Sequence, residues 1–543
     1  MNKVAAAAVM AAACAGWAQS PATQKPVSLM PGLSNLHHPV STTNAEAQQF
    51  FDQGLRLVYA FNHDEAARSF RRAAELDPKL AMAWWGVALA VGPNYNLPVD
   101  PEHEQAAVDA IDAAKKLVFS APQIEKDYID AMAKRYSHDA KPDYHQLDVD
   151  YSRAMSELTR KYPDDLDAAT LYADSLMNLR PWRLWNPDGT PAEGTNEIVA
   201  TLEGVLRRDP NHIGAMHLYI HAVEASPHPE RALPYADRIA ALAPSAGHLV
   251  HMPAHIYERT GNFDGAREHN LAAAKADEDY AAATGSQGMY MMMYYSHNLH
   301  FGAIAASMQG HCTDAKRLAD RLAENLRPAL KDMPMVEPFV AVPLAIDVRC
   351  SRWDDLLAVA EPGSQKAVLK AYWLYGRGMA LAARGKIAEA EAAQKHLAAI
   401  EKATSRDDIF MPPVENHSWQ IFHIANDILA ARIAAAKGHR QAAIALLRDA
   451  AANQDQLLYD EPADWYYPVR ESLGGMLLQA GDVEGAEQVF RDDLAQNPRN
   501  PRSLFGLEEA LSRQKRDYEA SWIKQQLQSA WQGADVTLRV EDL

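Results

Sequence analysis

The feature that most constrains the fold of this chain is a histidine pattern that returns after a fixed interval. Two imidazoles and a carboxylate recur with an offset of 34 residues: His217, His221 and Glu224 return as His251, His255 and Glu258. Residues three or four positions apart share one face of a helix. A period of 34 residues is typical of helix–turn–helix units that stack into a solenoid. The pattern therefore predicts equivalent helices from consecutive repeats, each with two imidazoles and a carboxylate on one face.

Small residues and prolines follow the same frame from Phe50 to Pro498. The spacing of the tetratricopeptide repeat is met near the start by Gly54, Ala66, Phe70, Ala73 and Pro78, and near the end by Gly474, Leu477, Ala486, Phe490 and Pro498. Small residues allow close helix contacts, and the prolines end each second helix. The sequence shows no strand-like alternation of any length. We predict an all-α fold, a tetratricopeptide-type superhelix of antiparallel helix pairs over residues 46–543, with inserts at 180–194, 280–295 and 460–468.

The N-terminus has the pattern of an export signal. Lys3 precedes an apolar run, and small residues at Gly16 and Ala18 suit cleavage, which predicts a signal peptide over residues 1–18 and a periplasmic or secreted protein. Residues 19–45 are predicted to form an extended N-terminal segment, and we interpret its His37 and His38 as part of a solvated tail. No later apolar run is long enough to anchor the mature chain in a membrane.

Composition and cysteine usage narrow the classes of partner. The net charge of −18 and a pI near 5.6 argue against nucleic acid, because phosphate binding needs a basic surface. Cys312 and Cys350 both fall near interhelix turns of adjacent repeats. Since export permits disulfides, we predict a bridge between them.

Several segments resemble a group of exported bacterial tetratricopeptide-repeat proteins with His-x3-His motifs in consecutive repeats. The resemblance rests on FDQGLR at 51–56, YAFNHDEA at 59–66, HLYIHAVE at 217–224, HLVHMPAH at 248–255 and SHNLH at 296–300. It extends over nearly all of the mature chain. It implies the repeat fold and brings no activity with it.

Seven histidines fall at positions of first helices that face the concave groove of such an array: His217, His221, His248, His251, His255, His297 and His300. Packed helices lie about 8–10 Å apart, which suits a metal that bridges imidazoles of neighbouring repeats. Asp174 is a candidate further ligand or an acceptor for a ligand's ring nitrogen. Imidazole sites suit copper or zinc, and thioethers at Met252 and 289–293 favour copper.

The sequence supports three functional hypotheses. The first is an exported protein that holds one or two metal ions, copper before zinc, and acts as an oxidative or hydrolytic enzyme, with Glu224 or Glu258 as general base or orienting a metal-bound water. Two sets of histidines also resemble what a pair of copper ions bridging dioxygen requires. The second is a scaffold whose groove binds a small molecule, a peptide or an envelope partner. The third is metal capture and delivery without turnover.

Overall fold

The computed structural model describes residues 24–98, 100–363 and 367–543, so the predicted signal peptide over 1–18 lies outside it. Throughout the described ranges the regular structure is helical, and the extended pairings are isolated bridges such as Asn94 with Leu97. The predicted all-α fold of stacked helix pairs is confirmed. By its internal contacts the chain divides into two compact units.

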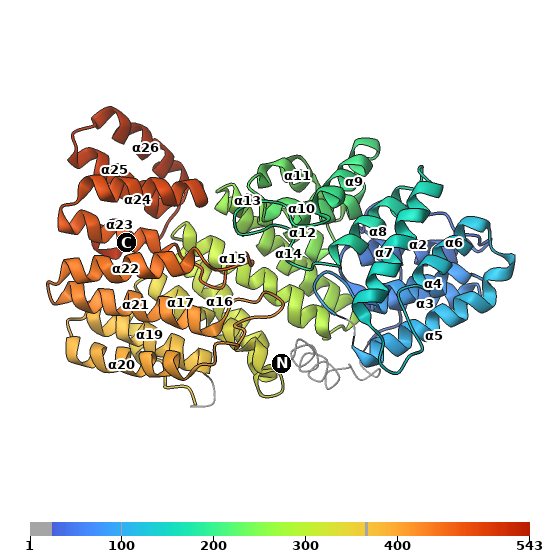
Figure 1. Ribbon diagram of the computed structural model, residues 1–543, viewed down its shortest axis with the longest axis horizontal. Helices are drawn as coiled ribbons and strands as arrows, with labels where there is room; N and C mark the ends of the chain where they lie inside the picture. Colours follow the sequence, from blue (N-terminus) through green and yellow to red (C-terminus); the bar gives the residue numbers. More distant parts are fainter. Residues whose placement is uncertain (1–23, 99, 364–366) are drawn as a thin grey trace. The chain divides into compact units, whose positions relative to one another are not determined.

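The first unit contains the described residues up to Ile256 together with His269–Asn298. Its helices pack on their sequence neighbours in antiparallel pairs, as Figure 1 shows for α2, α3, α4 and α5. The helices that lie wholly in this unit are α2 (Ala45–Tyr59), α3 (His63–Leu76), α4 (Ala81–Val91), α5 (Pro101–Leu117), α6 (Gln123–Met132), α7 (Tyr144–Lys161), α8 (Leu166–Met177), α9 (Thr195–Arg208), α10 (Ile213–Glu224), α11 (Leu233–Leu242) and α12 (Gly247–His251).

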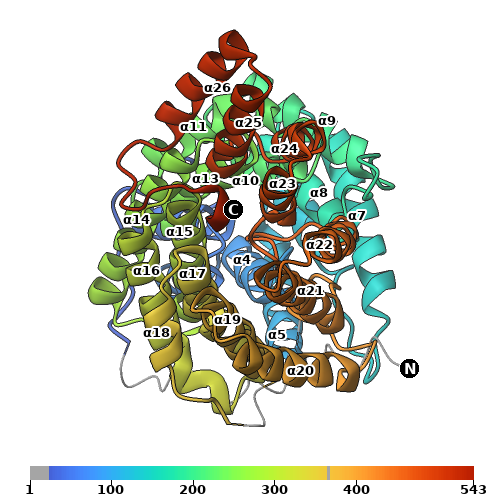
Figure 2. The same cartoon turned by 90° about the vertical axis from the view of Figure 1, so that its left-hand side faces the viewer.

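The second unit contains Tyr257–Glu268 and the residues from Leu299 on. Figure 2 shows its helices α21 to α24 nearly end-on. Its own helices are α16 (Cys312–Leu326), α17 (Glu337–Arg349), α18 (Trp353–Ala358), α19 (Ala367–Ala383), α20 (Ile387–Ala403), α21 (Ser418–Ala436), α22 (Arg440–Gln454), α23 (Val469–Ala480), α24 (Val483–Gln496), α25 (Pro501–Arg513) and α26 (Asp517–Ala530). The boundary between the units falls within α13 (Pro253–Arg259), α14 (Phe263–Thr284) and α15 (Ser296–Met308).

The glycines of the repeat frame make room for a buried phenylalanine. In the first unit the ring of Phe70 lies where side chains on Gly54 and Gly86 would be, and a Cβ on either glycine would come within 2.7 Å of the ring. A larger residue at either glycine would push the helices apart, and this close approach explains why the repeat needs glycine there.

The N-terminal segment before α2 is bound along the first unit instead of extending into solvent. His37 Nδ1 lies 2.7 Å from Asp52, and His38 Nδ1 lies 2.8 Å from Asp167 on α8. Directly before His37, the backbone oxygen of Leu36 accepts a hydrogen bond from Arg56. The interpretation of His37 and His38 as a solvated tail is therefore wrong, because it overlooked their buried carboxylate partners. We call residues 24–44 the N-terminal strap.

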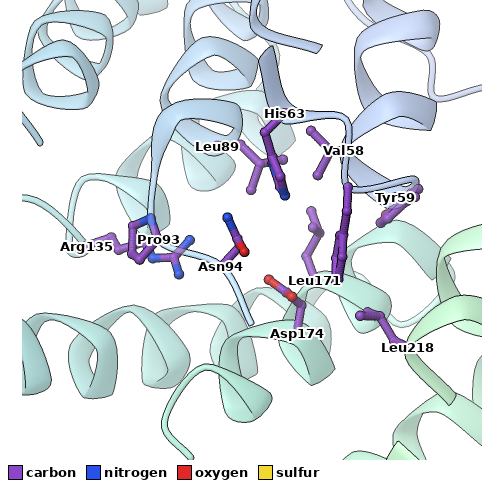
Figure 3. Close-up of a pocket in the computed structure, with 11 residues that line it drawn as sticks. Val58, Tyr59, His63, Leu89, Pro93, Asn94, Arg135, Leu171, Asp174 and Leu218 are labelled. Atoms are coloured by element: carbon purple, nitrogen blue, oxygen red, sulfur yellow. The ribbon is translucent and has the colours of Figure 1, made fainter. Parts of the chain in front are cut away.

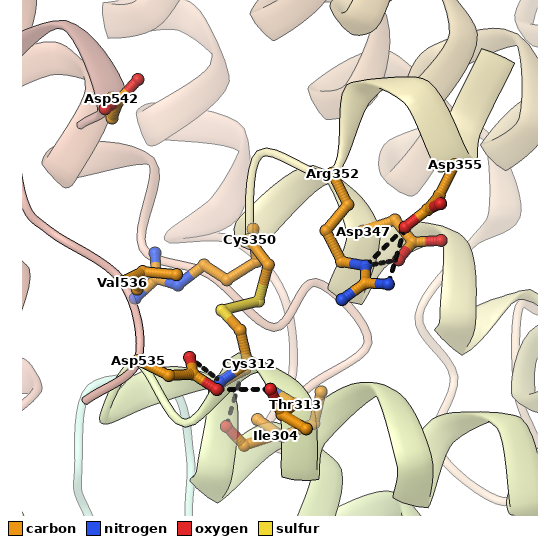
Figure 4. The surroundings of a disulfide bond; sticks show 12 residues. Ile304, Cys312, Thr313, Asp347, Cys350, Arg352, Asp355, Asp535, Val536 and Asp542 are labelled. Carbon is orange, nitrogen blue, oxygen red and sulfur yellow. Dashed lines mark hydrogen bonds and ion pairs between the residues drawn. A yellow bond between two sulfur atoms is a disulfide. The ribbon is translucent and has the colours of Figure 1, made fainter. Parts of the chain in front are cut away.

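In the second unit, Cys312 at the start of α16 and Cys350 at the end of α17 form a disulfide with a Cα–Cα distance of 5.8 Å. Figure 4 shows Asp535 beside it, accepting hydrogen bonds from the backbone N–H groups of Cys312 and Thr313. The bridge thus lies where the end of the chain returns to the start of α16. Among the described residues, no helix has the length and apolar character needed to cross a membrane.

Candidate metal centre

Helix α10 places the first histidine pair. It is apolar on every side and buried along its whole length, so its imidazoles point into protein and not into an open groove. Gly214 in its first turn allows Tyr59 of α2 to approach, since a Cβ there would lie 2.6 Å from the tyrosine ring. This contact brings the end of α2 against α10 and delivers the Tyr59 carbonyl to His217.

The second and third histidine segments lie on broken helices. Pro253 cannot continue the hydrogen-bond ladder, and the helix divides into α12 and α13 at Met252, with His251 before the break and His255 after it. His297 is the second residue of α15, which directly follows a π-helical turn over Met291–Tyr295. Such turns shift the side chains that follow them and are frequent at functional sites.

Six histidines form two triads. The first triad is His217, His221 and His248; the second is His251, His255 and His297. Within each triad the atoms that would ligate a metal lie within 4.8 Å of one another. Between the triads, the ring centroids of His221 and His255 are 5.2 Å apart, and those of His248 and His251 are 5.7 Å apart. The two triads therefore adjoin along two pairs of rings.

Hydrogen bonds at Nδ1, the ring nitrogen that points away from each triad, define the tautomers of His217 and His251. His217 Nδ1 lies 2.7 Å from the backbone oxygen of Tyr59, which only accepts, so this nitrogen carries the proton. His251 Nδ1 lies 2.7 Å from the side-chain oxygen of Asn270. In both rings the proton on Nδ1 leaves the lone pair of the neutral imidazole on Nε2, the atom that faces the rest of the triad.

Glu224 joins the two triads. One of its carboxylate oxygens lies 2.9 Å from Nδ1 of His221, and the other lies 2.6 Å from Nδ1 of His255. A carboxylate oxygen beside Nδ1 favours the tautomer with the proton on Nδ1 in each ring, which leaves the lone pair on Nε2. Carboxylate–histidine pairs of this kind are the usual outer support of metal-binding imidazoles.

Facing lone pairs are the strongest electrostatic feature of the second triad. Nε2 of His251 and Nε2 of His255 are 2.6 Å apart, although both rings place their proton on Nδ1. Burial, followed by the neighbouring His255, holds the pKa of His251 well below its ordinary value, so an added proton is disfavoured there. Burial and His221 act likewise on the pKa of His217. A cation bound by both Nε2 lone pairs would relieve this repulsion.

Phe61 covers the first triad from an unusual backbone position. Its ring centroid is 4.4 Å from that of His217, 5.3 Å from that of His248 and 5.9 Å from that of His221. The residue ends α2 in a left-handed conformation, φ 54°, with Phe61 N bonded to Val58 O and the next amide bonded to Leu57 O. This turn favours glycine, and glycine fills it after other helices, at Gly261, Gly310, Gly385, Gly438 and Gly481. A phenylalanine held at this position points to a role for its ring.

Other aromatic side chains complete the wall around the first triad. Tyr95 and Trp182 lie against His221, with ring centroids 5.5 and 6.3 Å away, and Tyr294 lies 4.8 Å from His248. Trp182 belongs to the insert at 180–194, which supplies part of this wall. A dry, aromatic surrounding lowers the local dielectric constant and controls access of solvent to any bound ion.

A small cavity is lined by Phe61 and by other apolar and polar side chains. Figure 3 shows His63, Asn94 and Asp174 converging on it, with Arg135 at its edge. It has room of about 20 Å³ for a water-sized molecule, enough to hold water. Burial raises the pKa of Asp174 to about 6 and lowers that of His63 to about 4. Asp174 thus belongs to this cavity and to neither triad.

The remaining predicted residues lie elsewhere. His300 belongs to the second unit, where its ring contacts Phe339 and Tyr466 and burial lowers its pKa to about 3. Glu258 also belongs to the second unit. Sequence reasoning missed Phe61, Tyr59 and Asn270. The available signal for the first of these was a phenylalanine after α2 at a turn where most later repeats carry glycine, although Ser351 and Lys515 also occupy it.

Another group of potential ligands, in the second unit, is better described as an ion-pair cluster. His423 lies 2.8 Å from Glu401 and 3.1 Å from Asp449. The hydrogen bond to Glu401 is the main cause that raises the pKa of His423 to about 9. A ring that holds both protons offers no lone pair to a metal.

No protein-family model matches this chain, and no curated protein sequence matches it. Among solved structures, the human IFIT1 dimer with m7Gppp-AAAA is 12% identical over 90% of this chain and 91% of that chain, with a TM-score of 0.35. Yeast Tom70 is 12% identical over 89% of this chain and 93% of that chain, with a TM-score of 0.27. The P58(IPK) TPR domain is 12% identical over 87% of this chain and 99% of that chain, with a TM-score of 0.21. These similarities carry no argument about function.

Proposed function

We propose that this protein is an exported metalloprotein that binds two transition-metal ions, one in each histidine triad, with copper preferred and zinc second. The observation that carries the proposal is the 2.6 Å approach of two Nε2 atoms whose rings both hold their proton on Nδ1. Neutral imidazoles in a buried position have no reason to face one another in this way unless a cation joins them.

The charge of the site favours copper in its monovalent form. Each triad supplies neutral ligands, and Glu224 is the carboxylate that both triads share. Two divalent ions would leave a large positive charge in a buried, aromatic surrounding, whereas two monovalent ions leave much less. Imidazole is a ligand of both copper and zinc, so the binding of both metals is tested.

In this role Glu224 positions the ligands and is not free to act as a general base. Both of its oxygens lie against imidazole N–H groups, and its side chain is buried.

The peptide-binding scaffold is the competing function. Its groove-lining histidines would be exposed, but five of the six triad histidines are at most 3% exposed and His297 is partly buried.

The test is a metal count on the full mature protein. The protein is stripped with a chelator and titrated anaerobically with Cu(I) against a coloured competing chelator, and separately with Zn²⁺. We expect about two coppers per chain, one for each triad. His217→Ala is expected to remove the copper of the first triad and His251→Ala that of the second.

His228→Ala is the matched control, because His228 is exposed and pairs only with nearby Glu230 among the described residues. Circular dichroism of each stripped variant shows whether it folds, and His217→Gln and His251→Gln serve where alanine does not. A folded wild-type protein that binds neither metal would end the proposal and leave the scaffold.

A further inference from the structure

The two histidine triads adjoin and share one supporting carboxylate. The His221–His255 and His248–His251 ring pairs join the triads. The Glu224 carboxylate contacts one histidine of each triad, His221 in the first and His255 in the second. Enzymes with two-metal centres hold their ions about 3.5–4 Å apart and bind one substrate between them. Independent storage sites need no such shared support.

Three histidines per ion leave a coordination position open. A metal site that only stores or stabilises closes its coordination sphere with protein ligands, while a site that reacts keeps one position for a substrate. Each triad groups three imidazoles whose candidate ligand atoms lie within 4.8 Å of one another. Because rings of the two triads lie 5.2 and 5.7 Å apart, ions held by the triads would have their open positions close to one another.

The surroundings select a small, uncharged ligand. His217, His248 and His255 are at most 2% exposed, and the aromatic rings of Phe61, Trp182 and Tyr294 cover the first triad. A charged or bulky substrate would lose its hydration and find no countercharge in this wall. A diatomic apolar molecule enters such a space at little cost.

We propose that the copper-loaded centre binds dioxygen between its two ions. This inference rests on the proposed function, since it needs a copper in each triad. Each Cu(I) gives one electron to the dioxygen molecule and becomes Cu(II), and each forms one bond to oxygen. The two electrons reduce the O–O double bond to a single bond, so the bound molecule is a bridging peroxide dianion. No proton is consumed, and no histidine leaves its ion.

Neutral ligands suit this electron transfer. The two positive charges that appear when the coppers are oxidised are balanced by the two negative charges that appear on the oxygen between them, so the net charge of the buried site does not change. Glu224 holds His221 and His255 in place as the charges on both ions rise. Zinc in the same triads has no electron to give, which makes the zinc-loaded protein an internal control.

The experiment starts from the full protein loaded anaerobically with two Cu(I). Air-saturated buffer is added while dioxygen uptake is followed with an electrode and the absorption spectrum is recorded. We expect uptake of about one dioxygen for two coppers, a new charge-transfer band, and an O–O vibration that shifts with ¹⁸O₂. Argon purging that reverses the band would identify reversible binding, and a band that persists would identify a stable adduct; both support the proposal.

Variants separate this proposal from the binding of copper itself. His217→Ala is expected to keep the copper of the second triad yet lose the uptake and the band, because one ion supplies one electron. Two controls accompany these variants: copper-loaded His228→Ala should respond like wild type, and the zinc-loaded protein should show neither the uptake nor the band. If wild type binds two coppers and oxygen then produces Cu(II) without the band or the vibration, the dioxygen proposal is overturned while the metal proposal stands. If fewer than two coppers bind, the proposed function itself fails.

Discussion

At the scale of single residues, the centre depends on which nitrogen of each imidazole holds the proton. The carbonyl of Tyr59, the side chain of Asn270 and the carboxylate of Glu224 lie beside Nδ1 of four of the six rings and favour a proton on that nitrogen. They set the direction of the lone pairs, which is the property that a metal recognises.

Glu224→Gln tests this role. An amide offers one acceptor oxygen where the carboxylate offers two, so either His221 or His255 loses its acceptor. Loss of such a support lowers metal affinity by about 10–100-fold. Copper competition titrations measure the change, with Glu230→Gln on the surface as control. Unaltered affinity at both triads would show that Glu224 does not orient the ligands.

Phe61 gives a second prediction at this scale. Phe61→Ala removes a buried ring and is expected to destabilise the fold by about 3–5 kcal/mol. Phe61→Gly loses the same ring but relieves the left-handed backbone, so we expect it to be no less stable than the alanine variant in spite of the flexibility of glycine. Both should release copper to a chelator faster than wild type. If both variants release copper at the wild-type rate, the ring of Phe61 serves only to pack the core.

At the scale of elements, the N-terminal strap binds the first unit through a pH-dependent pair. Burial alone would lower the pKa of His38, but its hydrogen bond to Asp167 and the charge of that residue raise it above 6.5. Burial would raise the pKa of Asp167, but hydrogen bonds from His212 and His38 hold it well below 3.8. The stabilisation from His38 is present below pH 6.5 and is lost as pH rises through its raised pKa. That from Asp167 is present above pH 3.8 and is lost as pH falls through its lowered pKa.

The pair should therefore stabilise most near pH 5. We expect His38→Ala to lower the free energy of unfolding by about 1.5–3 kcal/mol there and by less at pH 9. Denaturant titrations at the two pH values measure the difference. The control is His37→Ala, whose ring is half-exposed and whose loss should cost at most about 1 kcal/mol. An equal loss at both pH values would rule out the charged form of His38 as the stabilising one.

The disulfide joins two other elements, α16 and α17. It closes a loop with a sequence separation of 38 residues, and such a loop is worth about 3–4 kcal/mol. Cys312→Ser with Cys350→Ser should lower the stability of the second unit by that amount. Thiol labelling of the unfolded, unreduced protein checks the bond directly, because two reactive thiols at these positions would show that it does not form.

At the scale of the whole molecule, the proposed metal centre and the disulfide belong to different compact units. All six triad histidines are in the first unit, and Cys312 and Cys350 are in the second. Metal bound only by the folded first unit adds its binding free energy there, about 2.7 kcal/mol at a free concentration one hundred times Kd. In calorimetry we expect copper to raise the unfolding transition of the first unit. A metal effect confined to the second unit would contradict the assignment of the centre.

The sequence alone determined the helical repeats and the histidine pairs on them. Apolar spacing, small residues and the interval of 34 residues are local properties, and they are enough to place His217 with His221 and His251 with His255 on common helix faces. The predicted position of the first histidine pair on the surface of a concave groove was wrong, because every residue of the helix that carries this pair is buried.

The tertiary structure decided how those pairs meet. The break at Pro253 and the π-helical turn before His297 orient the second triad, and the contact of α2 with α10 brings Tyr59 and Phe61 to the first. Helix periodicity does not predict the break, the π-helical turn or the contact of α2 with α10, because they depend on backbone distortions and on segments about 150 residues apart. For the same reason the sequence could not divide the histidines into two triads, or place one carboxylate between them.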